Sequence, residues 1–469
     1  MSDIKLALEE LELMEDDYED KYQQTMDEFE TGLEALDGLI NIVEYRQSLS
    51  TKSNISQEDI DHLKDLVTVA FGLEDHDDTH CLFPSLEHYT DVSVALENFD
   101  KKLSGTIVYM WKHLIDLFKS GAQFTQYAFS IINLLNKKFD EAFSSANQVK
   151  DINITVPVSN YVCYGERKDV VKDEKEYIQK LEKSVSLLCD IADNFGTYTK
   201  NSLLDNIRVA FAYLTLRSDN KLESMFDDLY KMTKGISNNP EMRKTVEGGN
   251  GQLSVYRSDV MLGMYKATIS QPPTDINLDT INMKALKRYT RSMYLGVEKY
   301  ISRYEDNNES TVEFHITKSN LSKIESTLRP LTQSYKSFNS NLSRLVMLEK
   351  MFNISHLITG VFNNLRMISK GVGIAGKSIS AADQAIKSGM ADSIPGGRDA
   401  VGKAGLIGAG VGVGLSVAGA LGTYMIFSLT NVRVFMKASS NILQNNHKIF
   451  TLTRGHLKTA ILIAEKSTR

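Results

Sequence analysis

The most explicit chemical signature in the chain is a phosphate-binding motif. Residues 371–378 read Gly-Val-Gly-Ile-Ala-Gly-Lys-Ser and match the pattern GxxxxGK[ST]. In a P-loop the backbone amides surround the phosphates, the lysine reaches the β- and γ-phosphates and the hydroxyl holds Mg²⁺. That geometry requires a buried strand directly before the loop, but residues 364–370 continue a helical pattern and include Arg366 and Lys370. Because a glycine-rich region produces this match easily by chance, we keep a P-loop NTPase only as an alternative.

A second group of residues has metal-ligand chemistry but not metal-ligand spacing. His76, His80 and Cys81 follow one another closely, beside Asp75 and Asp77, yet their spacing matches no known zinc site. The chain contains no Ser/His/Asp order, paired-carboxylate motif or HExxH spacing. We therefore predict no catalytic residues, metal site or cofactor, and we do not expect an enzyme.

The elements around these residues are divided by charge. Residues 1–97 contain 26 acidic and 5 basic side chains, a net charge of −21, whereas residues 98–469 contain 34 acidic and 48 basic side chains, a net charge of +14. Such asymmetry predicts an acidic segment that shields a basic body with affinity for polyanions or anionic lipid. Apolar residues at helical spacing among the carboxylates predict two short amphipathic helices there, Leu6–Asp20 and Phe29–Leu39. The alternative is a solvated acidic helix pair.

The end of the acidic block carries candidate cleavage sites. A small residue stands two places before six of its 13 glutamates, namely Glu9, Glu34, Glu58, Glu74, Glu87 and Glu97, but before only one of 15 in the rest of the chain. The two sites at the charge boundary are Ser85-Leu86-Glu87 and Ala95-Leu96-Glu97. Exposed block ends are where proteolysis acts, so we expect the acidic segment to be a propeptide.

With these features the chain resembles the internal head proteins of large tailed bacteriophages. The resemblance rests on the acidic propeptide, the small-x-Glu sites of the kind that a prohead protease cuts, the PSLE…VALE-F run at Pro84–Phe99 and the basic helix that follows. It is clearest over about residues 1–140. It implies a virion protein made in the host cytoplasm, packaged with DNA inside the capsid, trimmed during maturation and ejected with the genome. The implied partners are the prohead protease, the capsid interior and scaffold, packaged DNA and the host membrane.

The start of the body reads as one or two helices over Asn98–Phe139. Apolar and aromatic residues share a face, and lysines stand at its margins. This pattern predicts contact with DNA or lipid, although a core helix with lysines reaching out to solvent produces it as well. The candidate contacts are Lys101, Lys102, Lys112, Lys119, Lys137 and Lys138.

Further elements follow from periodicity. Residues 152–164 and 252–270 favour short strands, and Glu174–Phe195 favours a helix. A heptad pattern predicts a long helix with a kink near Pro330, a residue that cannot donate to the helical ladder. Its positions are Leu321, Ile324, Leu328, Leu331, Tyr335, Phe338, Leu342 and Leu345.

The last part of the chain combines a glycine-rich apolar stretch with a basic tail. Residues 404–432 carry no charge and are long enough to cross a bilayer as a helix. Small residues at four-residue spacing, including Gly408, Gly410, Gly412 and Gly414, form the kind of face by which membrane helices pack. A membrane-active effector or pore component is therefore the second alternative, beside a buried helix or a loop. The basic tail suits either phosphate contact or a solvated face.

Together these patterns predict a mainly α fold. We expect an elongated multi-helix bundle with a small strand-containing insert in the middle and a Gly-rich apolar helix near the C-terminus. The expected divisions are the acidic propeptide (1–97), a basic helical region with short strands (98–315), a long heptad-patterned helix (316–370), a Gly-rich apolar segment (371–432) and a basic C-terminal helix (433–469).

Overall fold

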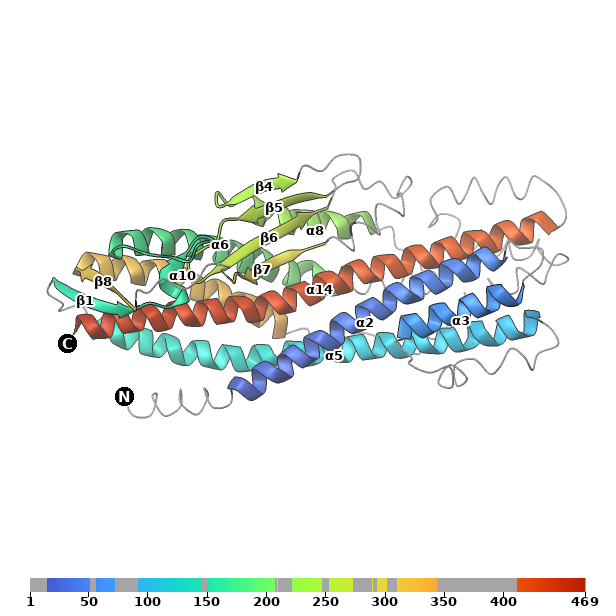
Figure 1. Ribbon diagram of the computed structural model, residues 1–469, viewed down its shortest axis with the longest axis horizontal. Helices are drawn as coiled ribbons and strands as arrows, with labels where there is room; N and C mark the ends of the chain where they lie inside the picture. The colour runs from blue at the N-terminus through green and yellow to red at the C-terminus, as the bar shows by residue number, and fades with distance from the viewer. Residues whose placement is uncertain are drawn as a thin grey trace.

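A computed structural model shows an elongated bundle built on three long helices. It describes residues 15–50, 56–71, 92–145, 151–206, 209, 222–246, 253–272, 289, 293–301, 310–343 and 411–468. Helices α2 (Glu15–Ser50), α5 (Val92–Ser145) and α14 (Val411–Ser467) run along the long axis (Figure 1). The predicted mainly α, elongated bundle is confirmed, and the described strands form small antiparallel sheets.

Helix α2 is a wall of this bundle. Its apolar residues recur at alternating four- and three-residue steps, which places them on one face, and all are buried: Tyr22, Met26, Phe29, Leu33, Leu36, Ile40 and Val43. We expected two short helices here. That prediction is wrong over the described part, because the apolar repeat continues without a break and holds α2 together from Glu15 to Ser50.

Helix α3 (Gln57–Phe71) folds back along α2. A capping box fixes its start: Ser56 N donates to the Asp59 carboxylate (3.0 Å) and Asp59 N donates to Ser56 Oγ (3.3 Å). The Tyr45 hydroxyl of α2 also donates to Asp59, over 3.0 Å. One buried carboxylate therefore sets both the cap of α3 and its connection to α2.

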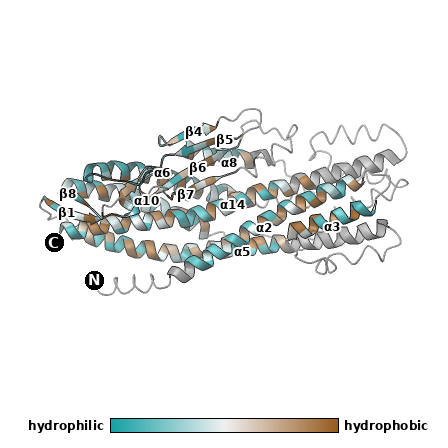
Figure 2. Ribbon diagram, in the orientation of Figure 1, coloured by the Kyte–Doolittle hydropathy of each residue, from teal (hydrophilic) through white to brown (hydrophobic). Residues whose placement is uncertain are grey.

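Helix α5 continues without a break through the helical region predicted at Asn98–Phe139. Its buried face includes Leu114, Phe118, Ile132, Leu135 and Phe139. Figure 2 shows hydrophilic and hydrophobic residues mixed along α2, α5 and α14, as expected of helices that each bury one stripe.

Two small antiparallel strand pairs lie toward the end of the bundle near the C-terminus. Strand β1 (Ile152–Pro157) pairs antiparallel with β8 (Thr311–Ile316). After the short 3-10 turn η3 (Asn160–Val162), β2 (Cys163–Tyr164) pairs antiparallel with β3 (Asp169–Val170).

A four-stranded antiparallel sheet lies on one side of the bundle (Figure 1). Its order is β4 (Met242–Val246), β5 (Ser254–Ser258), β6 (Tyr265–Gln271) and β7 (Leu295–Lys299). The strands predicted within 152–164 and 252–270 are confirmed. Sheet order follows chain order, so β7 forms the edge that meets α14.

Three further helices connect these parts. Helix α6 (Glu174–Tyr198), which ends in a π-helical turn η4 (Thr199–Leu203), packs against α10 (Lys318–Ser343). Helix α8 (Leu222–Ser237) lies between α6 and the sheet. The predicted heptad positions of α10 are buried from Leu321 to Leu342. The helix continues through Pro330, where we expected a kink.

Helix α14 lies at the centre of the fold. From Ile426 to Ser467 every described side chain except Thr451 is buried or half-buried. Many of these side chains are polar, among them Asn431, Ser439, Asn445 and His456, each at most 2% exposed. Helix α14 contacts α2, α5, α10 and β7, so all layers of the fold meet on it.

Candidate functional site

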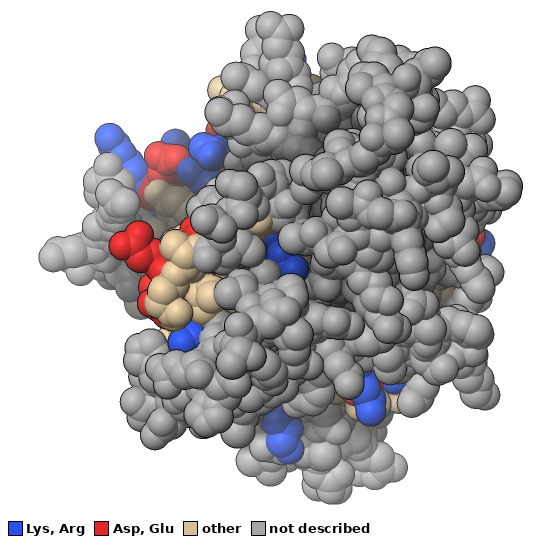
Figure 3. Space-filling model, turned by 90° about the vertical axis from the view of Figure 1, so that its right-hand side faces the viewer, with Lys and Arg blue, Asp and Glu red and all other residues tan. Residues whose placement is uncertain are grey.

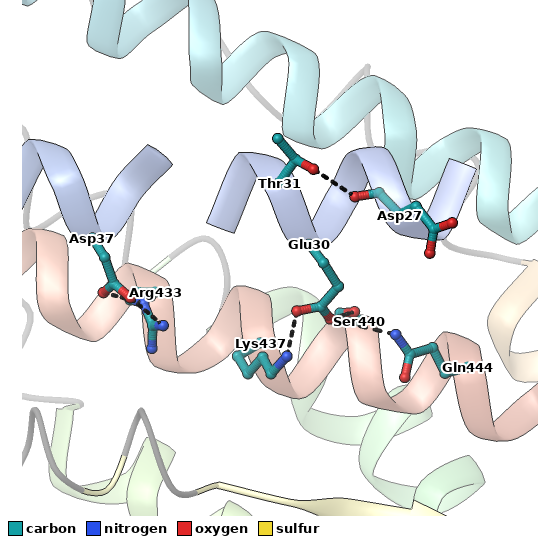
Figure 4. Close-up of polar contacts among 8 residues, drawn as sticks. All are labelled: Asp27, Glu30, Thr31, Asp37, Arg433, Lys437, Ser440 and Gln444. Atoms are coloured by element: carbon teal, nitrogen blue, oxygen red, sulfur yellow. Dashed lines mark hydrogen bonds and ion pairs between the residues drawn. The ribbon is translucent and has the colours of Figure 1, made fainter. Parts of the chain in front are cut away.

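Helices α2 and α14 carry opposite charges and lie antiparallel, side by side (Figures 1 and 4). Eleven acidic and two basic residues occur in α2, whereas six basic residues and one acidic residue occur in α14. We call their polar contact the α2–α14 seam. It comprises Glu19, Glu30 and Asp37 of α2 and Arg433, Lys437, Ser440, Gln444 and His447 of α14.

Glu30 is the centre of the seam. Its carboxylate pairs with Lys437 Nζ and accepts hydrogen bonds from Ser440 Oγ (2.8 Å) and Gln444 Nε2 (3.3 Å). The three donors share one face of α14 because they are spaced three and four residues apart. Side chains of a single helix thus form a three-donor receptor for one carboxylate (Figure 4).

Asp37 forms the second contact, two turns along α2. Its two carboxylate oxygens face Nε and Nη2 of Arg433. The Arg433 side chain is only 10% exposed and that of Asp37 30%, so this ion pair is largely shielded from solvent. A planar guanidinium opposite a carboxylate constrains direction as well as distance.

A third contact closes the seam near the start of α2. The Tyr22 ring stacks on His447 with centroids 4.5 Å apart, and the Tyr22 hydroxyl donates to the Leu443 carbonyl over 2.9 Å. His447 Nε2 lies 3.6 Å from Glu19 Oε1, and its interaction with Glu19 lowers the pKa of that carboxyl. Burial raises the pKa of the Tyr22 hydroxyl, which stays a hydrogen-bond donor.

The spacing of these contacts fixes the register of the two helices. Glu30 and Asp37 are seven residues apart on α2, and residues 433, 437, 440, 444 and 447 of α14 follow steps of four and three. A slide by one helical turn would separate every acid from its base while leaving apolar positions opposed. Polar groups at such positions are a recognised means of specifying register.

The predicted cleavage residues fall at two kinds of place. Ser85, Leu86 and Glu87 lie outside the described residues, whereas Ala95, Leu96 and Glu97 lie in the first two turns of α5. Proteases bind substrate as extended chain, so cleavage after Glu97 requires those turns to unwind. Two other small-x-Glu glutamates, Glu34 and Glu58, lie within α2 and α3.

The six predicted lysine contacts do not form one surface patch. Lys101 and Lys102 lie in the part of α5 whose side chains are not described. Lys112 and Lys137 are exposed. Lys119 pairs with Asp116 over 3.2 Å. Lys138, near the C-terminal end of α5, lies 3.9 Å from Glu465 of α14.

The predicted membrane glycines are only partly covered. Gly408 and Gly410 lie outside the described residues, as do the phosphate-binding motif and the His76–Cys81 group, while Gly412 and Gly414 lie at the start of α14. Over the described helices, none is both long and apolar enough to cross a membrane. The described ranges likewise contain no group of three His, Cys, Asp or Glu placed to hold a metal ion.

Part of the basic tail lies against the bundle rather than forming a fully solvated face, and phosphate contact by the tail stays a prediction. Arg433 and Lys437 are directed into the bundle toward α2, and Lys466 donates to the Thr155 carbonyl in β1. Burial lowers the pKa of Lys448. The boundary drawn at 432/433 also falls inside α14, which is one helix from Val411 to Ser467.

Charges are balanced elsewhere as well. A pocket of about 300 Å³ between α6 and the sheet contains Lys183 paired with Glu241 and Arg243 paired with Asp259, both at 3.0 Å. In the end view of the molecule, described acidic and basic side chains lie next to one another near one edge (Figure 3). The pocket therefore offers a ligand no excess of either charge.

Sequence reasoning missed the seam itself. The acidic block and the basic tail were both recognised, but nothing paired them. The available signal was the heptad repeat of α2 together with two basic residues one helical turn apart, Arg433 and Lys437, in the C-terminal helix. Periodicity of this kind indicates a partner helix without identifying it.

No protein-family model matches the chain, and searches of curated proteins and of solved structures find no similar protein.

Proposed function

We propose that this chain is an internal structural protein of a tailed-bacteriophage head, made with an acidic N-terminal segment that the prohead protease cuts. The α2–α14 seam is the observation that supports the proposal best. It directs carboxylates of the acidic segment onto cations of the basic body, as expected of a segment that neutralises the body while the head assembles without DNA. Two small-x-Glu sites lie at the end of that segment, at the charge boundary.

The proposed partners follow from charge. The prohead protease cuts the precursor, which binds the capsid interior and its scaffold. Packaged DNA contacts the basic body through its phosphates, without sequence readout. Such contacts weaken steeply as salt rises, because binding releases counterions. The protein is made in the host cytoplasm and is then located inside the capsid. Ejection with the genome and contact with the host membrane are extensions of the same proposal.

The deciding experiment is mass spectrometry of the N-terminus of the protein taken from mature particles. Cleavage after Glu87 or Glu97 makes His88 or Asn98 the first residue. Mature particles that hold only the uncut chain, with neither His88 nor Asn98 as a first residue, would refute the proposal.

Substitutions at the sites test which one is cut. Glu87→Gln should abolish the His88 terminus, and Glu97→Gln should abolish the Asn98 terminus. Glu58→Gln is the matched control, because Ser56-Gln57-Glu58 has the same small-x-Glu pattern but belongs to the capped start of α3. Processing that stops equally in the control would show that the pattern is not what the protease reads.

A further inference from the structure

The acidic segment is part of the core of the molecule. Among the most deeply buried side chains of α2 are Phe29 and Leu39, both 0% exposed, Leu33 and Leu36, both 1% exposed, and Val43, 2% exposed. Large apolar side chains at such exposures are what holds a fold together. A segment built only for disposal would not need them.

The surface that receives α2 is shaped to it. A β-carbon on Gly32 would lie 2.7 Å from Leu114 Cδ2 of α5, so the Leu114 side chain packs directly over the α2 backbone there. The Phe29 and Phe118 rings lie with centroids 6.4 Å apart, and Tyr22 meets Phe124 edge-on at 5.1 Å. Helices α5 and α14 therefore form a groove that fits one amphipathic helix.

The seam adds specificity for an acidic helix in that groove. The Glu30 and Asp37 carboxylates meet four polar side chains of α14. Asp27, one turn before Glu30, is exposed, and its carboxylate accepts a hydrogen bond from Gln23 of the same helix over 2.7 Å. Glu34 is exposed as well. Only part of the charge of α2 thus takes part in binding.

Both candidate cleavage positions leave this interface whole. Glu87 and Glu97 follow α2 and α3 in the chain, and the residues of α5 that meet α2, such as Leu114 and Phe118, follow both cuts. Cleavage removes a covalent tether and with it the effective concentration that the tether supplies. It removes none of the buried contacts.

We propose that the N-terminal fragment stays bound after cleavage, as a non-covalent subunit whose acidic amphipathic helix occupies the α5–α14 groove. That cleavage happens at all rests on the proposed function; retention rests on the packing. Cutting then leaves the net charge of the particle-bound protein unchanged, and packaged DNA contacts the basic body only at side chains that the fragment leaves exposed, such as Lys112 and Lys137.

The test uses the full-length chain with the recognition sequence of a site-specific protease inserted directly after Glu87. After complete cutting, size-exclusion chromatography and native mass spectrometry at 150 mM salt should show both fragments in one 1:1 complex, with unchanged helical circular dichroism. Separate elution of the N-terminal fragment, or loss of helix on cutting, would overturn the inference. Because the cut is engineered, this result does not depend on whether the phage protease acts.

Two matched double variants test the seam. E30Q/D37N removes two charges from the seam, whereas D27N/E34Q removes the same two charges from exposed positions of the same helix. In the cut protein, E30Q/D37N should raise the dissociation constant of the fragment at least tenfold, and D27N/E34Q should change it less than threefold. An equal effect of the two variants would show that general charge, not the seam, holds the fragment.

Mature particles provide the last test. Peptides from residues 15–71 should be present in them in equal amount to peptides from residues 411–468. If the N-terminus proves to be His88 or Asn98 and those peptides are missing, the proposed function stands and retention fails.

Discussion

Asn445 completes the edge of the sheet as a neighbouring strand would. Its Nδ2 donates to the Leu295 carbonyl over 2.6 Å, and its Oδ1 accepts from Val297 N over 2.7 Å. Gly296, with φ of 141°, makes room, because a β-carbon there would lie 2.0 Å from the Asn445 amide. One side-chain amide of α14 therefore pairs the free backbone groups of β7 that would otherwise be buried without partners.

Asn445→Ala should lower the free energy of unfolding by about 2–4 kcal/mol, because it leaves two buried backbone groups unpaired. Urea denaturation followed by circular dichroism measures this. Asn446→Ala is the control: Asn446 is also buried, but its Nδ2 has no hydrogen-bond partner within the described part of the chain, so the loss should be clearly smaller. Equal losses would show that the amide pairing contributes nothing particular.

His456 is a neutral histidine inside the bundle. Its ring is 0% exposed and meets Tyr161 edge-on at 5.3 Å, and burial lowers its pKa to about 4 from an ordinary value of 6.5. Between those two values the unfolded chain binds a proton that the folded chain does not. Stability from this group is therefore complete above pH 6.5 and is lost as the pH falls toward 4.

From pH 7 to pH 5, protonation of the unfolded state at His456 should reduce the free energy of unfolding by about 2 kcal/mol. A His456→Phe variant lacks this contribution, so its loss over the same interval should be smaller by that amount. Urea titrations of both proteins at the two pH values provide the comparison. Parallel losses in the two proteins would contradict the assignment.

At the scale of helices, close backbone approach decides which pairs pack. A β-carbon on Gly38 of α2 would lie 2.3 Å from Ala70 Cβ and 2.7 Å from Ala70 Cα of α3, where nothing can move aside without moving the helix. The corresponding neighbour of Gly32 is the far end of the Leu114 side chain, at 2.7 Å. The two glycines are therefore not equivalent, although both stand in α2.

Gly38→Ala should destabilise the protein by about 1–3 kcal/mol, since overpacking against α3 exceeds the helix propensity that alanine gains. Gly32→Ala, the matched substitution, should change stability by less than about 1 kcal/mol, because Leu114 can adopt another rotamer. Thermal or urea unfolding measures both. A larger loss at Gly32 would contradict the packing described for α3.

Element boundaries show how far sequence reasoning reaches. The heptad of α10 could be predicted residue by residue, because apolar spacing is a local property. The break expected within the acidic segment was wrong, since local charge density is high around residues 15–20 but burial of Tyr22 and Met26 outweighs it. The kink expected at Pro330 does not interrupt α10, where Pro330 faces solvent.

For the whole molecule, the contacts of α14 determine the order in which the helices unfold locally. It contacts every layer, whereas α3 packs chiefly on α2. Regions with few tertiary contacts open locally at low free energy, while central elements exchange only by global unfolding.

Hydrogen exchange should therefore find the amides of residues 433–464 the slowest in the chain and those of α3 at least tenfold faster. Native-state exchange followed by mass spectrometry gives the order directly. Equal protection of the α3 and α14 amides from exchange would contradict a fold in which α14 is the central helix.

The sequence by itself determined the helical class, the heptad stripes, the short strands and the separation of charge, because each follows from residues close together in the chain. Only the tertiary structure decided that Glu30 meets Lys437, 407 residues away, and that Arg433 and Lys437 face α2. Pairing over such a distance depends on how α2, α5 and α14 pack together, and no local pattern contains that information. The tertiary structure thus shows that α2 of the acidic segment contributes one side of the hydrophobic core.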